Sequence, residues 1–222
     1  MSAAGGPAEA GDPGGRPSAD AGGSISAAGA GAVAAFERVV AGDGVAVFPA
    51  DTVYGLACDP GSAAAVDRLY ALKGRPPAKP AAVMCFGAAP DLPGLGPRTL
   101  AAIAALTPGG VTLLLPNPGH RWPLACGPDP GTLGLRVIGG PLAAMPLPVL
   151  QSSANLAGGP DARRLDDVPA AIRDGADLVL DGGELPGTPS TVIDLRTYES
   201  EGSWRVLREG ALAVDTVATV LR

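Results

Sequence analysis

Short apolar segments with strand character recur along most of the chain, and their spacing constrains the fold more than any other feature. Segments with helical character lie between only some of them. Several neighbouring segments are too close together for the helical crossover that a regular parallel βαβ series requires. The pattern therefore predicts an α+β domain with a mixed sheet and helices packed on it. The predicted strands span residues 45–48, 81–86, 111–115, 133–138, 148–152, 177–180, 191–195 and 204–208.

Helical periodicity and capping residues predict the segments that flank this sheet. Ser62 is the expected N-cap of a helix that Gly74 ends, because a glycine adopts the backbone conformation of a helix C-terminus without strain. Residues 50–56, which follow the first strand, are predicted to form a polar loop. The other helices are predicted over residues 33–40, 98–106 and 167–174.

The domain organisation follows from length and local composition. A chain of 222 residues can build one sizeable core, and this length favours one domain. Residues 1–25 are mainly Ala, Gly, Pro and Ser and bury too little apolar surface to order, so they are predicted to be a disordered tail. Residues 26–222 are predicted to be the folded domain. No apolar run is long enough to span a membrane, and neither a signal peptide nor a transit peptide is indicated.

The cysteine and histidine content excludes several kinds of site. Cys58, Cys85 and Cys126 are odd in number and widely separated, which favours neither a disulfide framework nor a zinc site. A reducing, cytoplasmic location is therefore predicted. His120 is the only histidine, so catalytic schemes that need several histidines are excluded, and a surface-loop role is favoured for it.

The charge balance argues against a chain that binds nucleic acid through its overall field. With 16 basic and 22 acidic residues the net charge is −6 and the pI is about 4.7, which disfavours tight nonspecific binding to a polyanion. A local basic cleft remains compatible with this composition. The sequence contains neither G-x-x-x-x-G-K-[ST] nor a strand-linked G-x-G-x-x-G, so any nucleotide site must be of another kind.

The distribution of lysine singles out one segment. Lys73 and Lys79 are the only lysines, and they fall within seven residues of each other. A compact ammonium in a chain that otherwise uses arginine suits a phosphate contact, although two solvated lysines placed by chance are the alternative. Lys73 and Arg75 could face one cleft if the backbone turns at Gly74.

Small polar and basic residues also lie at the ends of predicted strands, where sheet proteins commonly place ligand-binding groups. Residues 151–155 follow one strand and residues 188–191 precede another, while Arg136 and Arg208 lie within apolar runs. Taken singly, each has an ordinary structural explanation as a cap, a turn or a solvated strand face.

Together these segments resemble the YrdC-like family, which includes the threonylcarbamoyl-adenylate synthases. The similarity runs in order from about residue 45 to residue 210, nearly the whole predicted domain. The matching segments are residues 48–56 (P-T-D-T-V-Y-G-L in the family), 73–76 and 79–80 (K-x-R-P and K-P), 108–113 (W-P-G-P-L-T), 132–137 (T-x-x-x-R-x-P), 153–155 (S-A-N), 181–183 (D-G-G), 190–194 (S-T-V-x-D) and 207–210 (L-R-x-G).

The resemblance implies a YrdC-like twisted mixed sheet with flanking helices and a large concave cleft that ATP and L-threonine share. It implies that Lys73 and Arg75 are catalytic and bind anionic parts of the substrates. The residues implied in nucleotide binding are Lys73, Thr132, Ser153, Asn155 and Arg208. Those implied in threonine binding are Thr52, Arg75, Arg136 and Ser190.

The implied activity is the synthesis of threonylcarbamoyl-AMP and pyrophosphate from L-threonine, bicarbonate and ATP. Such chemistry depends on positioning and charge neutralisation, so a chain without a histidine base can perform it. Mg²⁺ is expected as a cofactor bound through the ATP phosphates, with no direct protein ligands. The product would pass to a tRNA threonylcarbamoyl transferase complex, with weak or no direct tRNA binding by this chain.

The sequence departs from the family pattern at several positions, and the departures leave alternatives open. Ala50 replaces a threonine whose hydroxyl, in the family, lies near the amino-acid substrate; Thr107, Ile138 and Glu209 replace a Trp and two Pro residues. One alternative is a YrdC-like adenylating or carbamoyl-transfer module that uses a different amino acid or acceptor. Another is a noncatalytic RNA-binding protein built on the same fold.

Overall fold

The computed structural model describes residues 24–76 and 78–222. Most of the predicted tail, residues 1–23, lies outside the described residues. The last residue of that predicted tail does not fit the prediction, because Ile25 pairs in parallel with Leu180 and begins a short strand. A two-residue strand carries no periodicity, so the sequence could not indicate it.

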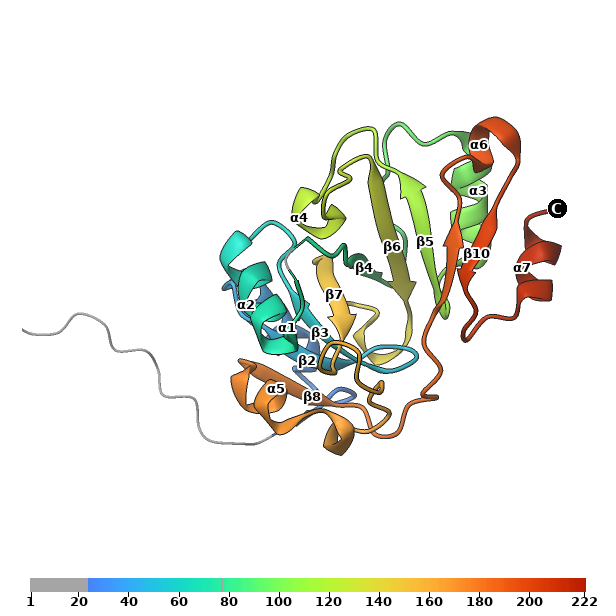
Figure 1. The fold of residues 1–222 in the computed structure, drawn as a ribbon. Helices are drawn as coiled ribbons and strands as arrows, with labels where there is room; N and C mark the ends of the chain where they lie inside the picture. Colours follow the sequence, from blue (N-terminus) through green and yellow to red (C-terminus); the bar gives the residue numbers. More distant parts are fainter. Residues whose placement is uncertain (1–23, 77) are drawn as a thin grey trace, which may run out of the picture.

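The described chain forms a ten-stranded mixed sheet with helices on both faces (Figure 1). The strand order is β1-β8-β2-β3-β7-β4-β6-β5-β9-β10. The pairs β1/β8, β8/β2, β4/β6 and β5/β9 are parallel, and the remaining neighbours are antiparallel. The strands are β1 (Ile25–Ser26), β2 (Ala46–Pro49), β3 (Tyr54–Cys58), β4 (Ala82–Phe86), β5 (Val111–Pro116), β6 (Thr132–Ile138), β7 (Val149–Ser153), β8 (Leu178–Asp181), β9 (Thr191–Asp194) and β10 (Arg205–Arg208).

The predicted helices are also present, with small shifts at their ends. Ser62 caps α2 as predicted, since its side chain accepts a hydrogen bond from the Ala65 backbone N–H, and Gly74 ends the helix in the left-handed conformation at φ 63°. The helices are α1 (Ala32–Ala41), α2 (Ala63–Lys73), α3 (Pro97–Leu106), α4 (Pro123–Cys126), α5 (Ala170–Gly175), α6 (Tyr198–Glu201) and α7 (Val214–Val220), with 3₁₀ turns η1 (Gly140–Leu142) and η2 (Leu165–Asp167).

The prediction of a polar loop over residues 50–56 is wrong at its C-terminal end. Tyr54 begins strand β3, all five residues of which are buried, and β3 pairs with β2 in a tight antiparallel hairpin. The polar residues Asp51 and Thr52 just before the strand, and Gly55 within it, obscured the apolar run in the sequence. The connection is therefore only residues 50–53, which places Asp51 and Thr52 at a sharp turn.

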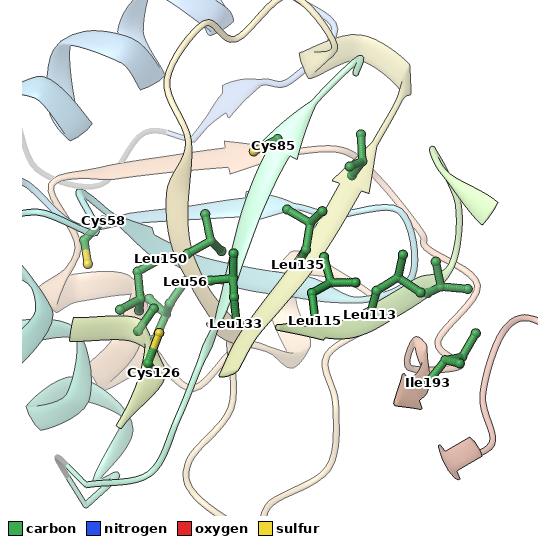
Figure 2. Packing of buried hydrophobic residues seen from close by; sticks show 14 of the residues in the cluster. Leu56, Cys58, Cys85, Leu113, Leu115, Cys126, Leu133, Leu135, Leu150 and Ile193 are labelled. Atoms are coloured by element: carbon green, nitrogen blue, oxygen red, sulfur yellow. The ribbon is translucent and has the colours of Figure 1, made fainter. Parts of the chain in front are cut away.

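Alternation along the strands divides the core into two layers on opposite faces of the sheet. On β6, Leu133 and Leu135 face the layer formed with helices α2 to α7. Figure 2 shows these two leucines packed against Leu113 and Leu115 of the neighbouring strand β5. Arg136 alternates with them and therefore projects from the opposite face.

Helix α1 covers only one end of that opposite face. Its Phe36 packs against Phe48 of β2 and Phe86 of β4, with ring centroids 5.2 and 5.8 Å apart. Leu142 of η1 closes the same cluster. The half of the face that carries β5, β6 and β7 lies beyond this cluster and is hollowed into a cleft.

We expect Phe36→Ala to lower the free energy of unfolding by about 3–5 kcal/mol, because it removes a fully buried ring and leaves a cavity under α1. Chemical denaturation monitored by circular dichroism measures this change. Leu100→Ala, on the exposed side of α3, is the matched control and should change stability by no more than about 0.5 kcal/mol. A loss below about 1 kcal/mol for Phe36→Ala would contradict this account of the α1 layer.

Candidate active site

The cleft on the open half of the sheet has a volume of about 210 Å³ and is basic. Its charged lining consists of three arginines and one acid, Asp161, whereas the whole chain has a net charge of −6. A basic cleft with low-dielectric walls concentrates anions locally. The polar and charged residues that line it are Thr52, Arg75, Thr112, Arg136, Gln151, Ser152, Ser153, Asp161, Ser190 and Arg208.

Lys73 lies directly behind the cleft wall and holds the loop after β7. Its Nζ donates hydrogen bonds to the Ser153 carbonyl at 2.5 Å, to Asn155 Oδ1 at 2.5 Å and to the Asn155 carbonyl at 3.0 Å. The side chain is buried, and this burial together with the nearby charge of Arg75 lowers the pKa of Lys73 to about 8. Lys73 therefore places Ser153 and Asn155 while supplying positive charge close to the cleft.

Arg75 leaves the same helix end in a different direction. The left-handed turn at Gly74 separates the two side chains, so Arg75 reaches the cleft while Lys73 turns behind it. The guanidinium donates to Ser152 Oγ at 3.3 Å and to the Pro80 carbonyl, and it lies 5.6 Å from the centroid of the Tyr70 ring. Stacking on an aromatic ring and a carbonyl contact hold a guanidinium that remains open to a ligand.

Arg136 is a buried guanidinium at the floor of the cleft. Its Nη2 donates to Asp51 Oδ1 at 2.5 Å and to Thr52 Oγ1 at 3.2 Å, and its Nη1 donates to Gln151 Oε1 at 3.3 Å. Burial raises the pKa of Asp51, while the charge of Arg136 opposes that shift. Within the described residues, Arg136 Nε and Asp51 Oδ2 are buried without a hydrogen-bond partner. Such unpaired buried polar atoms are rare in an ordinary protein core, because each one costs desolvation free energy.

The opposite wall is formed by β5, β9 and β10. Ser190 Oγ lies 2.7 Å from Thr112 Oγ1, and Arg208 donates to the Ser190 carbonyl at 2.7 Å and to its Oγ at 3.3 Å. Parallel pairing of β5 with β9 brings Thr112 and Ser190 together, although they are far apart in the sequence. This wall therefore presents two hydroxyls beside a cation.

The structure gathers most of the predicted site residues in one place. Lining the cleft are Thr52, Arg75, Arg136, Ser153, Ser190 and Arg208. Lys73 and Asn155 stand behind Ser153, as their hydrogen bonds show. Thr132 is outside the lining, and its hydroxyl donates instead to Asp129 Oδ2 at 2.6 Å.

The family motifs assigned no role to Thr112, Gln151 and Asp161, which line the cleft, or to Asp51, which pairs with Arg136 from outside the lining. Thr112 interrupts the otherwise apolar strand β5 on the face that carries Arg136, and that interruption was a usable signal. Gln151 begins the polar end of β7 on the same face. Asp51 and Asp161 belong to connecting segments, whose position depends on tertiary structure alone. No periodicity could have placed them.

A second cavity of about 770 Å³ lies on the other side of the pair formed by Asp51 and Arg136. Ala50 and Ile138, two of the departures from the family pattern, line this cavity and are absent from the cleft lining. Its charged lining residues are Asp51 and Asp181, with no basic side chain. The larger cavity therefore offers no cation to a phosphate, which leaves the basic cleft as the candidate active site.

The fold and the cleft define a class of protein: an α+β domain with a basic cleft, suited to an anionic ligand, on the open half of a mixed sheet. Residues 38–210 match the Sua5/YciO/YrdC family model, which is described as telomere recombination. The chain belongs to this family, as its sequence motifs predicted.

Individual relatives agree with this assignment. The threonylcarbamoyl-AMP synthase of Chromohalobacter salexigens is 39% identical over 180 residues, covering 76% of this chain and 93% of the relative. E. coli YciO superposes with a TM-score of 0.69 at 25% identity, over 82% of this chain and 90% of its own. P. abyssi Sua5 in complex with L-threonine gives a TM-score of 0.70 at 24% identity, over 85% of this chain and 57% of its own. The predicted fold class is confirmed.

Three further observations concern membrane spans, metal sites and cysteines. No helix in the described part of the chain is long and apolar enough to cross a membrane. Residues 24–76 and 78–222 contain no group of three or more His, Cys, Asp or Glu side chains placed to hold a metal ion. Cys58, Cys85 and Cys126 are free and buried, and burial raises the pKa of Cys58 to about 12 and that of Cys85 to about 11, which makes them unreactive thiols.

The lowered pKa of Lys73 predicts pH-dependent anion binding. Because a bound anion favours the protonated amine, affinity for AMP should fall roughly tenfold between pH 7.5 and 9.5, as Lys73 loses its proton near pH 8. Calorimetry at pH 8 in two buffers of different ionisation enthalpy should detect proton uptake on binding. Lys79→Ala is the control and should retain this pH dependence, whereas an affinity that stays constant over the range in the wild type contradicts the assignment.

The ion pair between Asp51 and Arg136 predicts a stability effect that a double mutant can isolate. Asp51→Ala leaves a buried guanidinium without its counter-ion and should lower the free energy of unfolding by about 3 kcal/mol. Combining it with Arg136→Met removes the unpaired charge and should restore part of that loss. Urea denaturation of both single mutants and the double mutant measures the coupling, and strictly additive losses would show that the pair is not coupled.

Proposed function

We propose that this chain is an L-threonylcarbamoyladenylate synthase, which makes threonylcarbamoyl-AMP and pyrophosphate from L-threonine, bicarbonate and ATP for threonylcarbamoyladenosine modification of tRNA. The observation that carries the proposal is the basic cleft, in which three arginines meet the loop held by Lys73. The curated synthases that match over most of their length, and the threonine complex of P. abyssi Sua5, support it.

The nucleotide is proposed to bind along the walls that carry Arg75 and Arg208. Each guanidinium lines the cleft and offers N–H donors to phosphate oxygens. Lys73 and Asn155 act on the nucleotide through Ser153, which they hold in place, and Lys73 adds charge from behind the wall. Thr132 would have to exchange its hydrogen bond with Asp129 before it could reach a ligand.

L-Threonine is proposed to lie deeper in the cleft. Arg136 suits its carboxylate, because this buried guanidinium is held by fixed neighbours and its Nη1, which donates to Gln151, has a second hydrogen to donate. Thr52 contacts that guanidinium, and Ser190 faces it from the other wall, so both hydroxyls border the same space. Arg75, at the mouth of the cleft, can contact either substrate.

The chemistry requires little beyond positioning and charge neutralisation. The threonine amine forms an N–C bond with the carbon of bicarbonate as a C–O bond of bicarbonate breaks, and the departing oxygen takes up the amine proton and leaves as water, which gives a carbamate. A carbamate oxygen then forms a bond to the α-phosphorus of ATP as the bond to pyrophosphate breaks. Arg75 and Arg208 neutralise the charge that develops on the phosphates, and Arg136 holds the amino acid in line.

Mg²⁺ is proposed to accompany ATP. Asp161 is the one carboxylate in the cleft lining, and no acidic cluster accompanies it there. Such a lining fits an ion held mainly by phosphate oxygens and water, as Mg²⁺ commonly is in nucleotide sites. When bound, the ion would neutralise phosphate charge alongside the arginines.

The product implies a partner. An acyl adenylate is reactive, so a transferase that places the threonylcarbamoyl group on tRNA must take it up, and a cytoplasmic location is proposed for both steps. Direct tRNA binding by this chain is expected to be weak, because its net charge is −6 and its basic groups are gathered inside the cleft.

Mass spectrometry of the purified protein with ATP, Mg²⁺, bicarbonate and L-threonine should detect threonylcarbamoyl-AMP, with pyrophosphate release that needs all three substrates. Lys73→Ala should lower kcat/KM at least roughly a hundredfold, because it removes charge and frees the loop that carries Ser153 and Asn155. Lys79→Ala is the matched control and should stay within about threefold of the wild type.

The same assay separates the alternatives. Pyrophosphate release that is indifferent to threonine contradicts the proposal. Equal turnover with L-threonine, L-serine and carbamoyl phosphate would favour a module with a different amino acid or acceptor. Binding of tRNA without ATP consumption would favour a noncatalytic RNA-binding protein.

A further inference from the structure

Gln151 is a buried amide in the wall of the cleft that neither the motifs nor the proposed reaction assigns. It lies on β7, four residues before Asn155, and its side chain reaches across β4 to Arg136. It is only 5% exposed, yet it lines the cleft. We propose that Gln151 is a specificity-determining residue whose amide N–H donates a hydrogen bond to the side-chain hydroxyl of the amino-acid substrate.

The orientation of this amide follows from its neighbour. Arg136 has N–H donors and no acceptor, so the atom that meets Arg136 Nη1 at 3.3 Å must be the amide oxygen of Gln151. The amide nitrogen consequently points away from Arg136. Among the described residues Nε2 has no hydrogen-bond partner, and it is not among the fully enclosed polar atoms, so it can reach a molecule in the cleft.

Gly55 makes room for this arrangement. Gly55 lies on β3, next to the strand that carries Gln151, and a Cβ atom there would come within 2.9 Å of Gln151 Nε2. The same Cβ would meet the Phe48 ring at 2.9 Å, so a larger residue here would displace the amide or the ring from its present position. A glycine at this position leaves space for the amide that contacts Arg136.

The chemistry of the neighbouring groups indicates what the amide nitrogen meets. The inference rests on the proposed function, in which Arg136 takes the carboxylate of the amino acid. The nitrogen and oxygen of one amide are about 2.3 Å apart. Because the amide oxygen of Gln151 meets Arg136, the amide nitrogen donates to a substrate atom other than the carboxylate that Arg136 binds. Ala50 cannot take that role, because it lines the other cavity.

Discrimination against an amino acid without the hydroxyl follows from burial. When the substrate lacks the hydroxyl, the buried amide of Gln151 is left without a hydrogen-bond partner and without water. This desolvation cost is the physical basis for rejecting an amino acid that lacks the hydroxyl. L-2-Aminobutyrate has the carbon skeleton of threonine without the hydroxyl. The wild type should therefore prefer threonine over it by at least roughly tenfold in kcat/KM.

The experiment compares L-threonine with L-2-aminobutyrate in the pyrophosphate-release assay, with ATP and bicarbonate saturating. Gln151→Met has a similar length but lacks the donor, and it should lower the preference for threonine roughly tenfold, mainly through KM for threonine, with KM for ATP unchanged. Gln151→Asn withdraws the amide by one methylene and should act in the same direction. Leu100→Ala, on the exposed side of α3, should leave the preference unchanged.

The outcomes separate this inference from the proposed function. If both substrates lose activity equally in Gln151→Met, the side chain merely holds Arg136 and the inference is wrong. The inference also fails if the wild type does not distinguish the two substrates. Absence of pyrophosphate release with any amino acid would instead overturn the proposed function. Thermal melts of both variants identify a loss of activity that is due to unfolding.

Discussion

The arrangement of the molecule depends on one buried cation, the guanidinium of Arg136. A charge on the inner face of a sheet is tolerated only when neighbouring groups satisfy it. Asp51 from the β2–β3 turn, Thr52 beside it and Gln151 from β7 provide these partners, so one side chain ties together three parts of the chain. The sheet face beside this guanidinium is polar, and the apolar α1 layer covers only the other end of the face.

Much of the fold could be predicted from the sequence, because its strands carry local signals. The apolar runs of β4, β5 and β6 are bounded by turn residues, and the Ser62 cap and Gly74 stop define α2. The misassigned segment, β3, shows the limit of this approach. Its strand character depends on pairing with β2 and β7 on either side, which is a tertiary property that five residues containing a glycine do not reveal.

The candidate site was only partly predictable, for a different reason. Motifs identify which residues belong together, but the direction of each side chain depends on backbone turns. Gly74 sends Arg75 into the cleft and leaves Lys73 behind it, although both belong to one motif. Ala50 likewise lies two residues from Thr52 yet faces another cavity, so its effect on the amino-acid site could not be judged from its place in the motif.

The pair of Asp51 and Arg136 also separates two spaces of opposite charge. On one side lie three arginines with a single acid, and on the other lie two acids with no basic side chain. Polyphosphates are therefore directed to the smaller space despite the greater volume of its neighbour. Because Asp51 balances the charge of Arg136 from behind, the guanidinium can meet a substrate carboxylate without leaving an uncompensated buried cation when the substrate departs. Volume alone favours the larger cavity, whereas the distribution of charge favours the cleft as the candidate site.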